Sequence, residues 1–354
     1  MRQRSVIVFE QAITSEASRK NYSYWLGRFV KFYKIKDIDS LLSIEPKKLQ
    51  IMIEDYLFEI KKTFQPNTVK HPISALRLFL SVNDVTLNWT KIRKFLPKQE
   101  NKTAGKRAYT TEEVIILLDN AHKITHKALI LVMASSGVRD QFVEDLKIKH
   151  LKEMPHNCLA MTVHPDTVYE YTTFINPEAK KMLEASYQYR TKQGEKITDE
   201  SPVFVTVKGR SMNGINVSNI LSRISKRALN RKIVYTNPNT NKNRYDVMSS
   251  YGLRKRFDTI LKMTTGINIH IVERMMSHKS KTIALDTSYF APTVEQSFSE
   301  YLKAMPQLFI NEKFKLKAEL ETTKNKIKDS KILEDRLRDV EAKLAQYEKL
   351  SKQL

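Results

Sequence analysis

Three short stretches of this 354-residue sequence carry side chains that could do chemistry. In "SSGVRDQF", Arg139 closely follows a glycine that ends a hydrophobic run, and "SSYGLRKRF" places Tyr251 and Arg254 on one helix face. The stretch "MMSHKSKTIALDTSYF" sets His278 eleven residues before Tyr289. Guanidinium groups bind phosphates, and an activated tyrosine is a nucleophile. Taken singly, each stretch has an ordinary explanation: a surface arginine beside a helix cap, one of three neighbouring basic residues, or a core aromatic.

Two other patterns do not form a known site. Gly209 and Gly214 have the spacing of a phosphate-binding loop, but the Lys-Ser/Thr pair that would reach phosphate and magnesium is missing after Gly214. His122 and His126 lie one helical turn apart, without the glutamate of a zinc-protease helix or a visible third ligand. We therefore expect no metal and no cofactor.

Composition favours a polyanionic partner. The 61 Lys and Arg residues exceed the 39 Asp and Glu residues, which gives a net charge of +22. Nucleic acid is the first choice of partner and an anionic membrane surface the second, ahead of a small-molecule substrate. The one cysteine, Cys158, excludes an internal disulfide framework and is expected to be a small buried hydrophobe. No apolar run is long enough to span a bilayer or form a signal peptide, so a cytoplasmic protein is expected.

The elements that must position these residues fall into two predicted domains. Apolar residues at helical spacing predict four short helices within residues 1–96, the last near "NWTKIRKF", and thus a small all-α domain. Residues 97–107 are polar and basic and are interpreted as a linker. Thr110 and Glu113 form a capping-box pattern that opens a second domain, residues 108–310.

That second domain is predicted to be mostly helical with one β-hairpin. In "CLAMTVHPDTVYEYTTFINPEA", two runs rich in Val, Tyr, Thr and Phe flank the turn residues "HPDT". Further helices are expected at "NVSNILSRISKRAL", "SSYGLRKRFDTILKM" and "NIHIVERMM". Residues 311–354 lack Gly and Pro and show leucines at heptad-like spacing, which predicts a helical, coiled-coil-like tail; a solvated single helix is the alternative.

Four motifs follow one another along this sequence: Gly-x-Arg, Tyr-x-x-Arg, His and Tyr. Their order and spacing resemble those of the tyrosine recombinase (phage integrase) family. The segment "NTVKHPISALRLFL" looks like the SAM-like core-binding domain of that family, and "SYFAPTVEQSFSEYLKAMPQL" resembles archaeal viral or mobile-element members. The resemblance covers roughly residues 10 to 310. It implies a mostly α fold with a small β-hairpin or sheet: a SAM-like helical DNA-binding domain, an α+β catalytic domain and the C-terminal coiled-coil-like helix.

The resemblance also implies site residues. Tyr289 would attack a DNA phosphodiester and hold the 3′-phosphate as a phosphotyrosine. Arg139 and Arg254 would bracket the phosphate oxygens, which gain charge in the transition state. His278 would donate a hydrogen bond to the phosphate or help to take the tyrosine proton, and Tyr251 would hydrogen-bond the phosphate.

This sequence departs from the family pattern at three places. Tyr251 stands where the family's second box usually begins with His, and a phenol is a poor base. The hairpin turn has no lysine to protonate the leaving 5′-oxygen, so His164 or Lys279 are the candidates to replace it. The interval from His278 to Tyr289 is about two residues longer than usual. In addition, Phe142 replaces the usual acidic residue, with Glu144 and Asp145 following.

The resulting hypothesis is a site-specific DNA recombinase or integrase that acts on double-stranded DNA in the cytoplasm, associated with the nucleoid. The family implies a homotetramer on two DNA sites, and the helix at residues 294–305 would be donated between subunits. One alternative is a recombinase-derived DNA-binding protein with weakened catalysis, and another is a type IB topoisomerase-like enzyme. A third is a structural or membrane scaffold that uses the basic surface and the tail.

Overall fold

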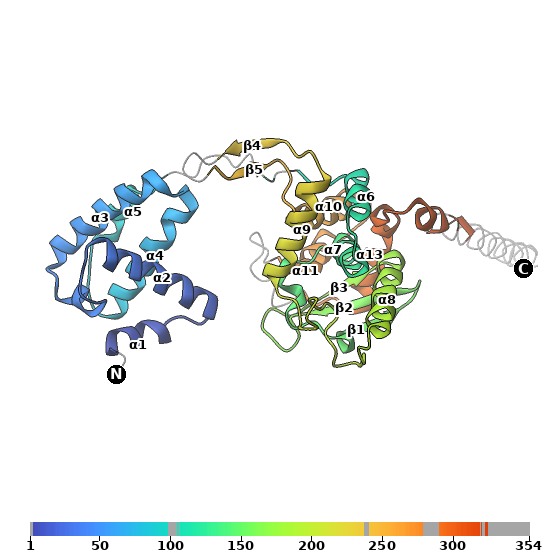
Figure 1. The fold of residues 1–354 in the computed structure, drawn as a ribbon, viewed down its shortest axis with the longest axis horizontal. Coiled ribbons are helices and arrows are strands. Elements are labelled where there is room, and N and C mark those ends of the chain that lie inside the picture. The colour runs from blue at the N-terminus through green and yellow to red at the C-terminus, as the bar shows by residue number, and fades with distance from the viewer. Residues whose placement is uncertain are drawn as a thin grey trace, which may run out of the picture. The chain divides into compact units, whose positions relative to one another are not determined.

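The computed structural model describes residues 3–97, 105, 107–236, 241–278, 290–318, 320 and 323–324. The chain forms two compact units (Figure 1). Unit 1 is Met1–Lys102 with Asn237–Asn241, and unit 2 is Thr103–Thr236 with Lys242–Leu354.

Unit 1 is built from helices around a core of aromatic and branched aliphatic side chains. Its helices are α1 (Arg4–Gln11), α2 (Glu16–Phe32), α3 (Pro46–Thr63), α4 (Pro66–Val82) and α5 (Trp89–Lys94), with a 3-10 turn η1 (Asp39–Ser43). The four helices expected from apolar spacing are present, and α1 is an addition. Its eight residues bury only Ser5 and Phe9, which is too little for a periodic signal. The Phe9 ring packs edge-on against Phe79 at 5.7 Å and thereby fixes α1 on the core.

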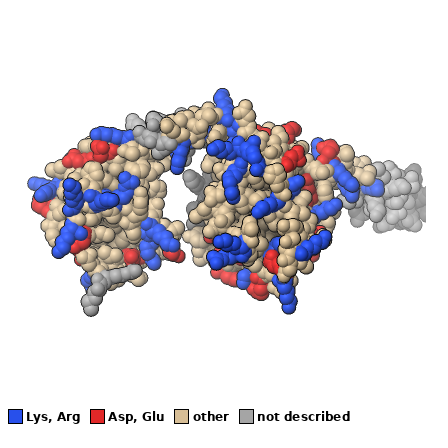
Figure 2. All heavy atoms as spheres, in the orientation of Figure 1, with Lys and Arg blue, Asp and Glu red and all other residues tan. Residues whose placement is uncertain are grey.

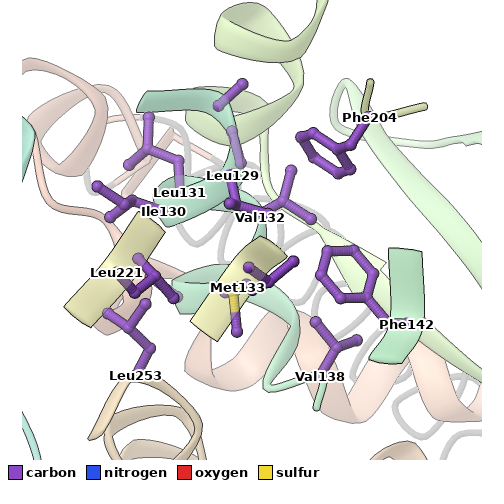
Figure 3. Close-up of a cluster of buried hydrophobic side chains, with 14 of the residues drawn as sticks. Leu129, Ile130, Leu131, Val132, Met133, Val138, Phe142, Phe204, Leu221 and Leu253 are labelled. Carbon is purple, nitrogen blue, oxygen red and sulfur yellow. The ribbon is translucent and has the colours of Figure 1, made fainter. Parts of the chain in front are cut away.

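Unit 2 contains the remaining helices. They are α6 (Thr111–Asp119), α7 (Ile124–Ser136), α8 (Pro177–Lys192), α9 (Gly214–Ala228), α10 (Tyr251–Met263), α11 (Ile269–Met275) and α13 (Val294–Leu308), with 3-10 turns η2 (Asp140–Val143) and η3 (Ile148–His150). The predicted capping box is confirmed, because Thr110 and Glu113 exchange both hydrogen bonds at the start of α6. All residues of α7 from Ala128 to Ser136 are buried. Figure 3 shows α7 side chains between Phe142 and Phe204 on one side and Leu221 and Leu253 on the other.

Two small antiparallel sheets lie in unit 2. The first has the order β1 (Leu151–Met154), β2 (Cys158–Val163), β3 (Tyr171–Ile175), and its β2–β3 pair confirms the predicted hairpin around "HPDT". The second is a hairpin of β4 (Ile233–Thr236) and β5 (Asn243–Tyr245) between α9 and α10. This hairpin was not predicted: its strands have only four and three residues, β5 (Asn-Arg-Tyr) is largely polar, and neither strand has a buried residue.

Helix α13 packs within its own unit. It lies against α7, α10 and α11, and the buried Tyr301 hydroxyl donates to the Ser135 carbonyl at 3.0 Å. Within this single chain the apolar face of α13 is covered by its own unit, and the donation of this helix to a neighbouring subunit stays a prediction. Cys158 is fully buried, as expected, with its Sγ 3.5 Å from Met305 Sδ of α13.

Among the residues that the structure describes, no helix is both long enough and apolar enough to cross a membrane.

Candidate active site

The first arginine is positioned by the end of α7. Gly137 caps this helix with a φ of +65°, and a Cβ there would lie 2.3 Å from the Phe257 ring, so only glycine fits. The chain then turns into η2, with Arg139 at its N-cap. The Arg139 guanidinium donates to the carbonyls of Met276, at 3.4 Å, and Ser277, at 3.3 Å. The structure thus joins Arg139 to a segment 137 residues further along the chain.

Arg254 projects from α10 into the interior of unit 2. It is only 2% exposed, and among the described residues it is the largest fully buried side chain. Its Nη1 donates to the Gly137 carbonyl at 2.5 Å, and its Nη2 donates to the Met276 carbonyl at 2.6 Å. Arg139 and Arg254 therefore converge on one carbonyl, that of Met276, at the end of α11.

Neither guanidinium forms an ion pair with a carboxylate among the described residues. Arg139 donates hydrogen bonds to two carbonyls, and Arg254 donates to two carbonyls and also contacts His278 and Tyr171. Burial and the charge of Arg139 lower the pKa of Arg254, and the charge of Asp258 offsets this only in part. A buried cation whose charge is only partly offset is costly, so this arrangement favours an anion that two guanidiniums can bind together.

His278 is held by hydrogen bonds at both ring nitrogens. Its Nε2 lies 2.8 Å from Arg254 Nη2, and its Nδ1 lies 2.7 Å from Glu273 Oε2. Because a guanidinium can only donate, Nε2 must be the acceptor and Nδ1 carries the proton. Burial and the charge of Arg254 lower the pKa of His278, while Glu273 raises it in part. Lys262 pairs with Glu273 and thereby holds this carboxylate in place. The carboxylate in turn orients the imidazole of His278, which is therefore placed as a neutral base.

Tyr171 is a site residue that sequence reasoning missed. It begins β3, and burial raises its pKa while the nearby charges of Arg254 and Arg139 lower that pKa. The His164 ring of the hairpin turn lies 6.5 Å from the Tyr171 ring. No sequence signal separates Tyr171 from the other aromatic residues of this hairpin.

Tyr251 lies at the first turn of α10, close to Arg254, and is 44% exposed. Its negative form would raise the pKa of Arg254, which is consistent with their closeness, and the Lys255 ammonium lies 5.8 Å from its ring. The phenol is therefore at the rim of the site, accessible to a large substrate.

Glu144, which follows Phe142 in the sequence, is used at the end of a neighbouring helix. The Glu144 carboxylate accepts a hydrogen bond from the Gly214 amide at the start of α9, a helix-end role, while Phe142 is buried in the core against Phe204. Asp140, which sequence reasoning did not single out, directly follows Arg139. It accepts a hydrogen bond from Ser250 at 2.9 Å and thereby ties η2 to the start of α10.

Tyr289 and Lys279, predicted as nucleophile and as a candidate acid, lie outside the described residues. The described chain resumes at Phe290, whose ring lies 6.2 Å from the His270 ring of α11.

Comparison with known proteins agrees with this geometry. A sequence profile described as the phage integrase family matches residues 107–295, more than half of the chain. The chain belongs to the phage integrase family. It is accordingly a tyrosine-type, site-specific DNA recombinase. No curated protein matches its sequence.

Solved structures of other recombinases share the fold. The XerH site-specific recombinase bound to a palindromic difH substrate matches with a TM-score of 0.55 and 16% identity, over 77% of this chain and 76% of that one. The Tn1549 transposon integrase bound to transposon right end DNA matches with a TM-score of 0.54 and 14% identity, over 84% of this chain and 98% of that one. At these identities the likeness is one of fold.

Proposed function

We propose that this recombinase cleaves and rejoins double-stranded DNA through a 3′-phosphotyrosyl intermediate on Tyr289. The observation that supports this most is the convergence of Arg139 and Arg254 on the Met276 carbonyl, next to the histidine that leads into the Tyr289 segment. A scissile phosphate would take the place of carbonyl oxygens as the acceptor for both guanidiniums.

The arginines, Tyr289 and His278 each have a role in the proposed cleavage step. Arg139 and Arg254 hold the two non-bridging oxygens and stabilise the charge that these oxygens gain in the transition state. When Arg254 turns from Nε2 of His278 to the phosphate, this nitrogen becomes free to accept a proton. The Tyr289 oxygen then attacks phosphorus as the bond to the 5′-oxygen breaks, and the phenol proton passes to Nε2 of His278. Of the two roles considered for His278, base and donor, the tautomer imposed by Glu273 supports the base.

The leaving 5′-oxygen needs a proton, and we assign its donation to His164. The turn of the β2–β3 hairpin has no lysine, and the His164 ring is adjacent to Tyr171 beside the arginines. Tyr251 at the rim contributes a hydrogen bond to the same phosphate.

The test is a covalent trap. The full-length protein is incubated with a library of nicked duplexes of random sequence, and DNA that remains attached after denaturation is recovered and sequenced. The native chain should yield adducts at one site, and Tyr289→Phe should yield none while still binding DNA. Adducts that persist in Tyr289→Phe would assign the nucleophile to another residue.

A protein that binds DNA yet gives no adduct at all would support the alternative of weakened catalysis, which the lysine-free hairpin turn favours. In that case restoring a lysine at the turn, as His164→Lys, should bring adducts back if the acid is the missing part.

We also propose a homotetramer on two DNA sites and, from "SYFAPTVEQSFSEYLKAMPQL", kinship with archaeal mobile-element integrases. Sedimentation of the protein with its trapped duplex should give a species of four chains and two duplexes. A single chain per duplex at saturating protein would overturn the assembly.

A further inference from the structure

The β4–β5 hairpin is an exposed basic element outside the site described above. Its described residues, 230–236 and 241–245, include four basic residues and three asparagines, with no Asp or Glu. Figure 2 shows basic and acidic side chains interspersed on the visible face of unit 2. The composition is that of a segment that contacts a polyanion.

The hairpin has no hydrophobic core of its own. Ile233 is 50% exposed and Tyr235 is 36% exposed, and Lys232, Lys242 and Arg244 are also exposed. The two strands extend from the body of unit 2 (Figure 1). An isolated two-stranded hairpin is only marginally stable in water, so a ribbon with apolar side chains facing outward is suited to being covered by a partner.

The base of the hairpin is firmly held. The Arg231 guanidinium lies 4.1 Å from the Tyr245 ring and donates to Ser249 Oγ at 3.1 Å. Just beyond the hairpin, Asp246 pairs with Arg107 at 2.9 Å. The two strands therefore extend from a rigid base, which lowers the conformational entropy that is lost when they bind a partner.

The base also leads directly to the phosphate-binding arginines. Five residues separate Tyr245 from Tyr251, the first residue of α10, and Ser250 between them bonds Asp140. A duplex held at Arg254 is therefore within reach of the hairpin, whose strands add about 3.3 Å per residue.

We propose that the β4–β5 hairpin is a second DNA-binding element of unit 2, which enters a groove of the duplex beside the scissile phosphate. A two-stranded ribbon fits the major groove of B-DNA, where asparagine can pair with adenine, while lysine and arginine neutralise phosphates at the groove edges. This inference rests on the proposed function, because it takes double-stranded DNA as the substrate.

The test compares two triple variants of the full chain with the same loss of charge. One is Lys232→Gln with Lys242→Gln and Arg244→Gln; the control is Lys181→Gln with Lys192→Gln and Lys196→Gln, on the exposed side and end of α8. Binding to a 30-bp duplex of mixed sequence is measured by fluorescence anisotropy at several salt concentrations, and circular dichroism verifies the fold of each variant.

The hairpin variant should bind at least about tenfold more weakly in 0.1 M salt, and its slope of log K against log salt should be smaller by about 2–3, since each phosphate contact contributes about 0.9. The control should change by less than about twofold. Equal losses of DNA affinity in the two variants would overturn the inference. A hairpin variant that keeps its DNA affinity but no longer self-associates would also overturn it, because the hairpin would then contact protein.

The two proposals fail differently. If the native chain binds DNA and forms the Tyr289 adduct while the hairpin variant matches the control, only the hairpin inference is wrong. If the native chain shows no salt-dependent DNA binding, the proposed function itself is wrong.

Discussion

Unit 1 and unit 2 use arginine in opposite ways. In unit 1, Arg28 lies exposed on α2, with its guanidinium 4.9 Å from the Phe64 ring and 5.5 Å from the Trp25 ring. In unit 2, Arg254 is almost wholly buried and fixed by two carbonyl groups and an imidazole.

This difference in burial suggests that the two arginines have different roles, one in DNA affinity and the other in catalysis. An exposed guanidinium over aromatic rings gains only about 0.5–1 kcal/mol, and its pairing with phosphate is screened by salt. A guanidinium already oriented and desolvated does not reorganise when charge develops on a phosphate, so its contribution to the transition state is larger. We therefore expect unit 1 to contribute binding and unit 2 to contribute the chemical step.

The largest effect should come from Arg254→Ala. Cleavage should slow by about 10²–10³-fold because one stabilising charge is lost from the transition state, with DNA binding largely retained. Single-turnover adduct formation and anisotropy measure the two quantities.

Arg256 provides a matched control on the same helix. It is also buried, but it donates to the carbonyls of Leu308 and Gln307 at the end of α13. Arg256→Ala should lower the free energy of unfolding by about 1–3 kcal/mol and spare the cleavage rate of the folded protein. Equal cleavage losses in both variants would remove the distinction between a catalytic and a structural buried arginine.

A smaller effect is expected for Glu273→Gln, measured as a pH profile. Because burial and the charge of Arg254 lower the pKa of His278, the neutral base is present at neutral pH and cleavage should fall only in the acid range, where the imidazole becomes protonated. The Glu273 charge raises this pKa, so its removal should shift the acid limb to lower pH. The plateau rate should fall about tenfold as the base weakens.

Glu184→Gln, an exposed change on α8, is the control for this profile. An acid limb that stays in place in Glu273→Gln would mean that another group than His278 titrates.

The smallest effect is expected for Arg28→Ala in unit 1. Affinity for duplex DNA should fall a few-fold and the salt slope should decrease by about 1, with the cleavage rate of bound DNA unchanged. A loss confined to the cleavage rate would contradict the division of roles between the units.

The sequence was sufficient to predict elements that have a periodic apolar pattern or that begin or end at a recognisable helix cap. The Thr110 capping box, the glycine end of α7 and the β2–β3 hairpin all depend on local pattern, and the structure contains each of them. Arg139, Arg254 and His278 were found through motif order, and the structure brings them together.

Features that depend on long-range packing could not be predicted in this way. Arg254, Lys255 and Arg256 are consecutive cations, and only the rotation of α10 against α7 and α13 decides which two are buried. Tyr171 and Asp140 reach the site through tertiary contacts that no local spacing encodes.

The position of Cys158 allows movement of α13 to be followed by thiol labelling of the unmodified protein. This lone thiol is buried in contact with Met305 of α13, and burial raises its pKa to about 12, so a thiol reagent reaches it only when the packing around it opens. The labelling rate of the unmodified protein thus measures how often this cluster, to which α13 contributes, opens. A rise in that rate on adding duplex DNA would show that substrate binding releases the helix.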